Sequence, residues 1–138
     1  MITAYVTFNG NTEEAFNFYR SALEGEITNI QRFADSPNGA QMPEADRKKV
    51  MHIELAGPDG IRLMGNDHLD MMGGPFHAGN NFSLSFHPDN EEVADQLFNR
   101  LSEGGTISVP MSKAPWGDYF GMFTDQFGIK WMINHRKK

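Results

Sequence analysis

Apolar and polar residues alternate along several short segments of this chain, which is the pattern of a strand with one buried face. In the first segment, residues 2–8, Ala4, Val6 and Phe8 share one side while tyrosine and threonine residues share the other. The same pattern predicts strands at residues 26–34, 49–57, 61–67, 81–86, 106–111, 118–125 and 129–134. Pro110 interrupts the strand at 106–111, which we therefore expect at the edge of a sheet.

Two other segments, residues 11–23 and 88–105, carry apolar residues at helical spacing. Asn11 or Thr12 can cap the first helix, and Gly25 is expected to end it. The second begins with Pro-Asp and stops at Gly-Gly, as helices often do. The expected buried stripes are Ala15, Phe16, Tyr19, Ala22 and Leu23 in the first helix, and Val93, Ala94, Leu97, Phe98 and Leu101 in the second.

The two halves of the chain repeat the same order of elements. "GIRLMGN" at 60–66 and "GIKWMIN" at 128–134 share glycine, isoleucine, methionine and asparagine at equal spacing. The helices align without a gap when Phe8 is placed opposite Phe86. We interpret this as an internal duplication and predict an α+β fold made of two β-α-β-β-β modules. The prediction is a single domain built of two repeats, residues 1–67 and 80–138, joined by the loop 68–79.

Composition narrows the class of protein. Apolar residues make up 39% and aromatic residues 12% of the chain, which is too much for a disordered protein. The absence of cysteine excludes disulfides and thiolate ligands and fits a reducing compartment. The formal net charge is −6 and the only basic run is the terminal "HRKK", so no nucleic-acid partner is expected. No signal-like start or long apolar run is present, so we expect a cytoplasmic protein without membrane contact.

At this point the residues resemble a known family. "GNTEEAFNFY" and "DQFGIKWMI", set in paired β-α-β-β-β modules, resemble the vicinal oxygen chelate superfamily, which includes glyoxalase I, extradiol dioxygenases and bleomycin-resistance proteins. "TFNGNTEEAFNFYRSALEGEI" and "WGDYFGMFTDQFGIKWMIN" are similar to its PhnB-like group in particular. The resemblance covers essentially the whole chain. It implies a mixed sheet curled round a cleft, and a homodimer.

Function follows less directly from this resemblance. The PhnB-like group has no well-defined activity, and one fold serves many functions. A methyltransferase activity in ubiquinone biosynthesis has been ascribed to such sequences. This chain has no glycine-rich turn between a strand and a helix of the kind that holds a nucleotide-like cofactor. We therefore expect no such activity.

The strand alternation sorts the side chains into two faces. The side expected to pack on the helices collects Ala4, Val6, Phe8, Met51, Ile53, Leu55, Ile61, Leu63, Phe82, Leu84, Phe86, Ile129, Trp131 and Ile133. The other side collects Tyr5, Thr7, His52, Glu54, Arg62, Met64, Asn66, Ser83, Ser85, Phe120, Met122, Lys130, Met132 and Asn134. This mixture of apolar and polar groups is typical of a ligand pocket. The alternative is a sheet face that meets water or a partner subunit.

The resemblance also locates the metal positions of the superfamily's enzymes, which take histidine or glutamate from the first and last strand of each module. These positions fall at Tyr5, Met64, Ser83 and Met132. Thioethers suit soft copper(I), and neutral serine and tyrosine are poor ligands for zinc, nickel, iron or manganese. We therefore expect no metal and no cofactor, and assign these four residues to ligand binding.

His52 is the candidate acid–base residue, because it lies beside Glu54 on the expected cleft face, where a carboxylate can hold the ring in one tautomer. The alternative is a structural or interface histidine. His68 and His77 lie in the 68–79 loop near aspartates and could hold a metal across a dimer, although solvated loop residues are more common. His87, before a proline, and His135, in the basic tail, indicate no chemistry.

Two loop features complete the candidates. Trp116 lies on a bend and is placed to roof a cleft, with Asp118 at its rim; a tryptophan that seals the core is the alternative. The segment "MMGGPF" at 71–76 is either a mobile lid or an ordinary loop.

These observations favour a PhnB-like homodimer that binds a small, partly apolar organic ligand in a cleft without a divalent metal. The first alternative is a lyase or isomerase acting beside a carbonyl group, with His52 as base and Arg62 or Lys130 facing the developing enolate. The second alternative is a structural dimer without a ligand.

Overall fold

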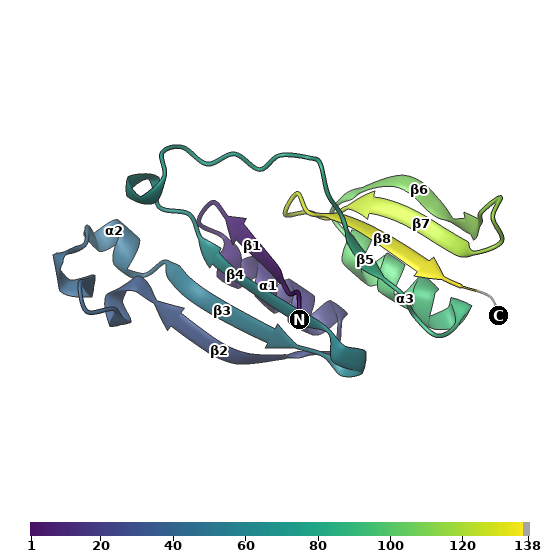
Figure 1. The fold of residues 1–138 in the computed structure, drawn as a ribbon, viewed down its shortest axis with the longest axis horizontal. Coiled ribbons are helices and arrows are strands. Elements are labelled where there is room, and N and C mark those ends of the chain that lie inside the picture. Colours follow the sequence, from purple (N-terminus) through teal and green to yellow (C-terminus); the bar gives the residue numbers. More distant parts are fainter. Residues whose placement is uncertain (137–138) are drawn as a thin grey trace. The chain divides into compact units, whose positions relative to one another are not determined.

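The computed structural model describes residues 1–136, and Lys137 and Lys138, the end of the basic run, lie outside the described residues. The chain forms two compact units, Met1–Ala78 and the part from Gly79 onward, which are described separately (Figure 1). The prediction that the two repeats make a single domain stays a prediction. Among the described residues, no helix has the length and apolar character needed to span a bilayer.

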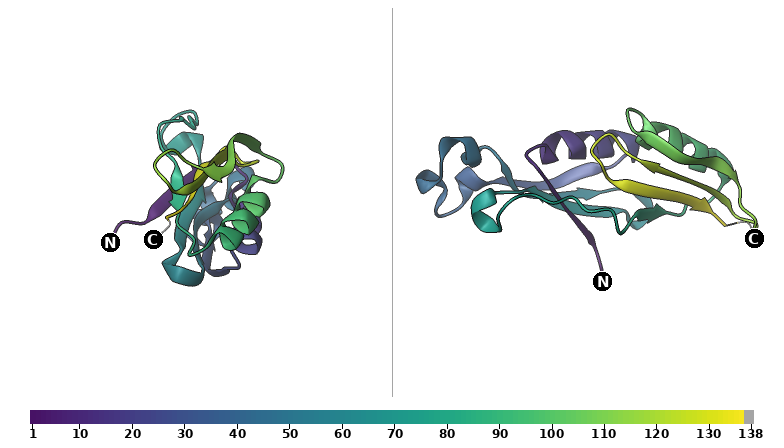
Figure 2. Two further views of the ribbon diagram at one scale, coloured as in Figure 1. Left: turned by 90° about the vertical axis from the view of Figure 1, so that its right-hand side faces the viewer. Right: turned by 90° about the horizontal axis from the view of Figure 1, so that it is seen from above.

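The first unit is a four-stranded mixed sheet with strand order β1-β4-β3-β2. β1 and β4 are parallel and the other neighbours are antiparallel. Helix α1 lies on one face of this sheet (Figure 2). The elements are β1 (Ala4–Phe8), α1 (Thr12–Ala22), β2 (Glu26–Arg32), the short helix α2 (Glu44–Arg47), β3 (Val50–Ala56) and β4 (Arg62–Asp67), with 3-10 turns at Phe33–Asp35, Gly39–Gln41, Pro58–Gly60 and Asp70–Met72.

The second unit repeats this arrangement with strand order β5-β8-β7-β6, again with one parallel pair, β5 and β8. Its elements are β5 (Leu84–Phe86), α3 (Glu91–Ser102), β6 (Thr106–Lys113), β7 (Tyr119–Thr124) and β8 (Lys130–His135). The predicted α+β class and the two β-α-β-β-β modules are thereby confirmed. β6, which contains Pro110, is an edge strand as expected. Neither sheet closes on itself, and the cleft that a curled sheet would enclose stays a prediction.

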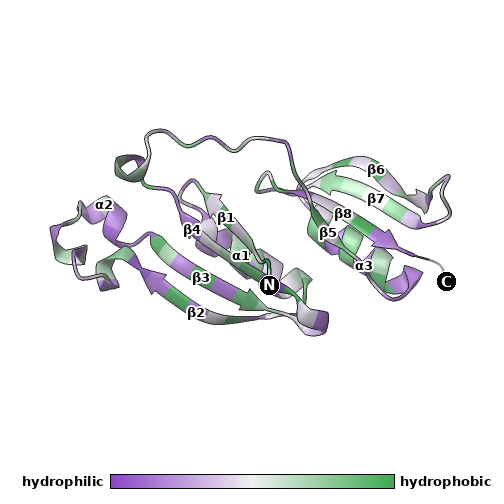
Figure 3. Ribbon diagram, in the orientation of Figure 1, coloured by the Kyte–Doolittle hydropathy of each residue, from purple (hydrophilic) through white to green (hydrophobic). Residues whose placement is uncertain are grey.

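The face of the first sheet that α1 covers holds the core of that unit. Phe16 packs edge to face against Phe8 and Tyr19, and Phe8 packs against Tyr19 at a tilted angle, with ring centroids 6.0–6.5 Å apart. A Cβ at Gly65 in β4 would lie 2.6 Å from the Val6 carbonyl oxygen and 2.9 Å from the Phe16 ring. Only glycine therefore lets α1 pack this closely on the sheet. Apolar and polar residues alternate along β3 in Figure 3, as the sequence predicts.

Three of the predicted buried residues are placed differently. Val93 is wrong as part of the buried stripe of α3, because it lies at the edge of that stripe and is 37% exposed. β3 carries a bulge, because Gln31 pairs with His52 while Arg32 pairs with Val50. The extra residue is Met51, so Val50 is buried in its place. Phe82 is also wrong as a core residue, since β5 starts only at Leu84 and leaves the Phe82 side chain 67% exposed.

Asp67, the last residue of β4, ties the start of α1 to the sheet. Asn11 occupies the N-cap position but makes no side-chain capping bond. The backbone N–H and the hydroxyl of Thr12 donate instead to Oδ1 of Asp67, at 3.0 and 2.6 Å, and the N–H of Val50 donates to Oδ2 at 2.8 Å. The expected cap is therefore replaced by a carboxylate from a distant strand, which satisfies the orphan donor at the helix start.

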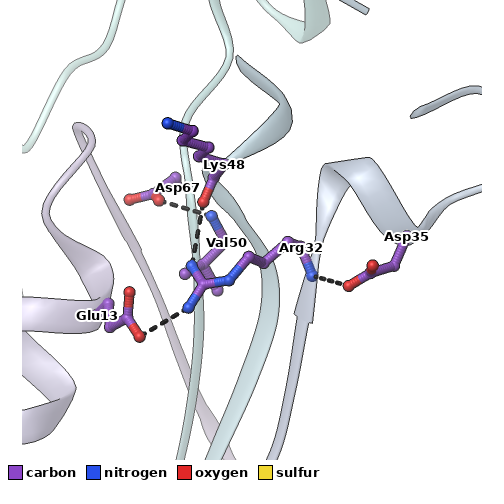
Figure 4. Close-up of polar contacts among 6 residues, drawn as sticks. All are labelled: Glu13, Arg32, Asp35, Lys48, Val50 and Asp67. Atoms are coloured by element: carbon purple, nitrogen blue, oxygen red, sulfur yellow. Dashed lines mark hydrogen bonds and ion pairs between the residues drawn. The ribbon is translucent and has the colours of Figure 1, made fainter. Parts of the chain in front are cut away.

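Arg32, at the end of β2, makes hydrogen bonds to the same part of the first unit, as Figure 4 shows. Its guanidinium donates to Oε2 of Glu13 at 2.8 Å and to the Lys48 carbonyl oxygen at 3.1 Å. Its backbone N–H donates to Asp35 at 3.2 Å. The bond to Glu13 raises the pKa of Arg32 further above its ordinary value. The end of β2, the start of α1 and the approach to β3 are thus held together by charge-assisted bonds.

Candidate functional site

The face of the first sheet opposite α1 carries four of the eight predicted site residues, and the other four belong to the second unit. We call it the first open face. By register, Tyr5 of β1 lies beside Met64 of β4, and Met64 lies beside Glu54 of β3. Thr7 donates its hydroxyl hydrogen to the side-chain oxygen of Asn66 at 2.8 Å. The members of this face are Tyr5, Thr7, His52, Glu54, Arg62, Met64 and Asn66.

Tyr5 and His52 form the central contact of the first open face. The Tyr5 hydroxyl lies 3.1 Å from Nδ1 of His52, and the two rings stack at 5.6 Å with an interplanar angle of 28°. Tyr5 stands on β1 and His52 on β3, so the tyrosine reaches across β4 to make this bond. Partial burial raises the pKa of Tyr5 above its ordinary value. The hydroxyl therefore stays protonated at neutral pH and can donate to Nδ1.

Glu54 lies between two cationic or protonatable groups. One carboxylate oxygen, Oε1, is 3.8 Å from Nε2 of His52 and 3.7 Å from a terminal nitrogen of Arg62. When Tyr5 donates to Nδ1, the ring proton of neutral His52 is on Nε2 and faces this carboxylate. Tyr5, His52, Glu54 and Arg62 thus form a connected polar set around the thioether of Met64, and such a set can bind a polar group or pass a proton.

The bulge at Met51 immediately precedes His52 in β3. Bulges re-aim the side chains that follow them and are frequent next to functional sites. Here the bulge keeps Val50 in the core while His52 and Glu54 both face away from α1. Alternation alone predicts the side of His52 correctly but misses the bulge, because nothing in "KVMHIEL" marks an extra residue.

The corresponding face of the second sheet is more apolar; we call it the second open face. Met132 of β8 lies between Met122 of β7 and Ser85 of β5. Ser83 precedes β5, and the register places Ser85 opposite Met132. The two units differ in the register of their parallel strands. Phe8 pairs with Asp67, whereas Phe86, its counterpart in the alignment of the helices, pairs with Ile133 and not with His135, the counterpart of Asp67.

Trp116 and Asp118 lie at the edge of the second open face. Trp116 is 64% exposed and contacts Phe120 of β7 edge to face at 5.5 Å, so it does not seal the core of its unit. A carboxylate oxygen of Asp118 accepts a hydrogen bond from the Asn134 amide at 3.1 Å and lies 4.0 Å from Nε of Arg136. Lys130 is turned to the Asn80 carbonyl oxygen, to which it donates at 3.3 Å. The binding roles assigned to these residues stay predictions.

Among the residues that the structure describes, neither loop histidine belongs to a group of three histidine or acidic residues that could hold a metal ion. Nε2 of His68 donates to the Gly74 carbonyl oxygen at 2.6 Å and lies 3.2 Å from Asp70. The His68 ring also packs edge to face on Phe76. These contacts close the loop on itself, while Met71 and Met72 are 70% and 69% exposed. A role for His68 or His77 across a dimer stays a prediction.

The fold implies a divalent metal in related enzymes, and the donor set decides whether this chain fits one. Tyr5 and Met64 stand side by side in the first unit, and Ser85 and Met132 in the second. None of these residues offers an imidazole or a carboxylate. The same holds for Ser83, which the sequence alignment placed at this position in the second unit. Within residues 1–136, no three histidine or acidic residues are grouped to hold a metal ion. The residues present do not fit the superfamily's metal.

Comparisons with known proteins agree with this architecture. Protein YjdN of Escherichia coli K12 is 27% identical over 141 residues, which is 96% of this chain and 93% of that protein. The crystal structure of PA1353 from Pseudomonas aeruginosa is 36% identical with a TM-score of 0.86, covering 100% of this chain and 98% of that one.

A Bacillus cereus PhnB protein, described as a putative 3-demethylubiquinone-9 3-methyltransferase, is 28% identical with a TM-score of 0.77 and 98% coverage of both chains. The resemblance predicted from the sequence is thereby confirmed. Residues 2–133 match the model of the Glyoxalase/Bleomycin resistance protein/Dioxygenase superfamily. The chain therefore belongs to this superfamily.

Proposed function

We propose that this protein binds a small, partly apolar organic ligand on its first open face, without the divalent metal of its enzymatic relatives. The observation that carries the proposal is the polar set Tyr5–His52–Glu54–Arg62 arranged around Met64. A thioether and a tyrosine ring offer contact to an apolar body, and the surrounding groups offer donors and an acceptor to a polar end. A ligand with a ring and one carboxylate or carbonyl group matches this surface.

Methionine methyl groups provide a direct test. In protein labelled with ¹³C at the methionine methyls, Met64 reports on the first open face, and the exposed Met71 and Met72 serve as internal controls. Aromatic carboxylic and keto acids are titrated one at a time. We expect a saturable shift of the Met64 signal, and about tenfold weaker binding in Arg62→Gln because one charge-assisted bond is lost. If the compounds that bind shift the methyl signals of Met71 and Met72 as much as that of Met64, the proposal is contradicted.

A second candidate is an enzyme that acts beside a carbonyl group, and the Tyr5–His52 hydrogen bond favours it. In this reaction the His52 ring takes its other tautomer, in which Nδ1–H donates to the Tyr5 oxygen. Nε2 then takes a proton from the carbon next to the carbonyl, and the electron pair moves to the carbonyl oxygen facing Arg62. Deuterium exchange into a bound keto acid, followed by NMR, measures the step. Loss of exchange with unchanged affinity in His52→Ala supports the enzyme. Loss of affinity alone supports the binding protein.

The proposal includes a homodimer in the cytoplasm. Absence of cysteine suits a reducing compartment, and the superfamily implies the dimer. Light scattering coupled to gel filtration gives the assembly mass directly. A monomer at micromolar concentration would contradict the dimer, and recovery of the native protein from an oxidising compartment would contradict the location.

A further inference from the structure

The ends of β5 and β8 form a hollow in the second unit that lies outside the first open face. It has a volume of ≈ 520 Å³ and is lined by His87, Pro88, Asp89, His135 and Arg136. Because β5 and β8 are parallel, both strands deliver their last residues to the same edge of the sheet. Two imidazoles and one guanidinium therefore line one hollow, with Asp89 as the only acidic residue among the five.

Hydrogen bonds fix how the two rings present their nitrogens. Nδ1 of His135 lies 2.9 Å from the Pro88 carbonyl oxygen, which only accepts, so Nδ1 carries the proton. Nε2 of His135 is then the nitrogen that gains a proton when the ring becomes charged. Nε2 of His87 is engaged with the Ser85 hydroxyl at 3.1 Å, which leaves Nδ1 for a ligand. Protonation of both rings adds two N–H donors to the guanidinium of Arg136.

The internal repeat shows what stands at this place in the first unit. The match of "GIRLMGN" with "GIKWMIN" sets His135 in the position of Asp67, at the end of the last strand. Asp67 is a buried carboxylate that accepts three hydrogen bonds from its own chain. In the second unit the Asn90 side chain caps α3 by accepting from the Val93 N–H, and the carboxylate is replaced by an imidazole. At this place the first unit therefore holds a carboxylate, whereas the second unit holds imidazole and guanidinium groups.

We propose that this hollow binds a phosphate group, free or on a phosphomonoester, and that binding strengthens as the pH falls. Imidazoles change charge between about pH 5 and 8. Arg136 and Asp89 both line the hollow, and each imidazole that takes up a proton adds a positive charge to it. The other charged groups nearby are Asp118, 4.0 Å from Arg136, and Tyr119, which pairs with His135 and donates to Asp95 of α3. A tetrahedral oxoanion matches three donors that come from two chain segments, His87 after β5 and His135–Arg136 at the end of β8.

Sulfate is the first probe, because it keeps both negative charges across this pH range, so that a change in affinity reports the protein alone. Ring signals of the histidines are followed by NMR at constant ionic strength, at about pH 5.5 and about pH 8. We expect saturable shifts confined to His87 and His135 at the lower pH, and at least about tenfold weaker binding at the higher pH. Inorganic phosphate and a phosphomonoester are then compared.

His135→Asn is the discriminating variant, because its amide can still donate to the Pro88 carbonyl but lacks the second nitrogen. We expect it to weaken sulfate binding about tenfold, and Arg136→Gln to do the same. Arg136 is 83% exposed, so its replacement tests the proposal even if His135→Asn fails to fold. His77→Asn, in the other unit, is the matched control. Equal shifts at His77, affinity independent of pH, or unchanged binding in both variants would overturn the proposal.

Discussion

Replacing Asp67 by asparagine changes one atom in the bond set that joins β4, α1 and β3. The side chain is 4% exposed, and both of its oxygens accept from buried donors. An amide can keep its oxygen toward Thr12 only by turning its NH₂ group toward the Val50 N–H, 2.8 Å away. Two donors then face each other, and the two bonds from Thr12 lose the charge of their acceptor.

The expected cost follows from these three bonds. An unsatisfied buried N–H at Val50 costs about 1–3 kcal/mol, and each Thr12 bond weakens by about 1 kcal/mol when its acceptor becomes neutral. The free energy of unfolding should therefore fall by about 3–5 kcal/mol, which for a chain of this size lowers the melting temperature by about 10–15 °C. Because the side-chain volume is unchanged, no cavity contributes to this difference.

Urea unfolding followed by circular dichroism measures the change, with thermal unfolding as a second readout. Asp59→Asn is the matched control, since it removes the same charge from an exposed turn with positive φ, a conformation that asparagine tolerates. It should alter stability by less than about 0.5 kcal/mol. A loss below about 1 kcal/mol in Asp67→Asn would refute the reasoning, because buried donors would then tolerate the missing acceptor.

Three further predictions follow from single contacts. Gly65→Ala should destabilise the protein by about 2–3 kcal/mol in urea unfolding, because its Cβ would lie 2.6 Å from a backbone oxygen, whereas Gly73→Ala, with nothing within 4 Å, should not. The Asp95 carboxylate, which accepts from the hydroxyl, raises the pKa of Tyr119 to about 12 from 10.0. The Tyr119–Asp95 hydrogen bond therefore contributes fully to stability below about pH 10, and its contribution is lost as the pH rises toward 12. Absorbance titration measures the ionisation of Tyr119, and an Asp95→Asn variant in which this ionisation occurs at the same pH would contradict the assignment. Asn90→Ala removes the cap of α3 and should cost about 1 kcal/mol in the same unfolding assay, and no loss would show that the Val93 N–H is satisfied by water.

The fold was predictable because the signals were local and repeated. The period-2 segments, the two helical stripes and the matched hairpins determine β-α-β-β-β twice, and both sheets have that order. Phe82 was misplaced because periodicity cannot tell where a strand begins. Met51 was misplaced because a bulge depends on how β3 pairs with β2, and pairing is not local.

The candidate site was only partly predictable, for the same reason. Alternation placed His52, Glu54 and Arg62 on one face, but the bond from Tyr5 to His52 crosses an intervening strand. The helix cap was missed because Asp67 lies 55 residues from Thr12 in sequence. His87 and His135 gave no signal in isolation, since each becomes informative only when the parallel pairing of β5 and β8 brings the strand ends together.

Native mass spectrometry of protein purified without chelators or an affinity tag tests the central claim most directly, because one spectrum weighs the polypeptide, any metal and any retained small molecule. The account predicts a species that carries an added organic compound of low mass and no stoichiometric metal, and it predicts that the compound is lost in His52→Ala or Arg62→Gln. A stoichiometric divalent ion that a chelator removes, with no organic compound retained, would contradict it.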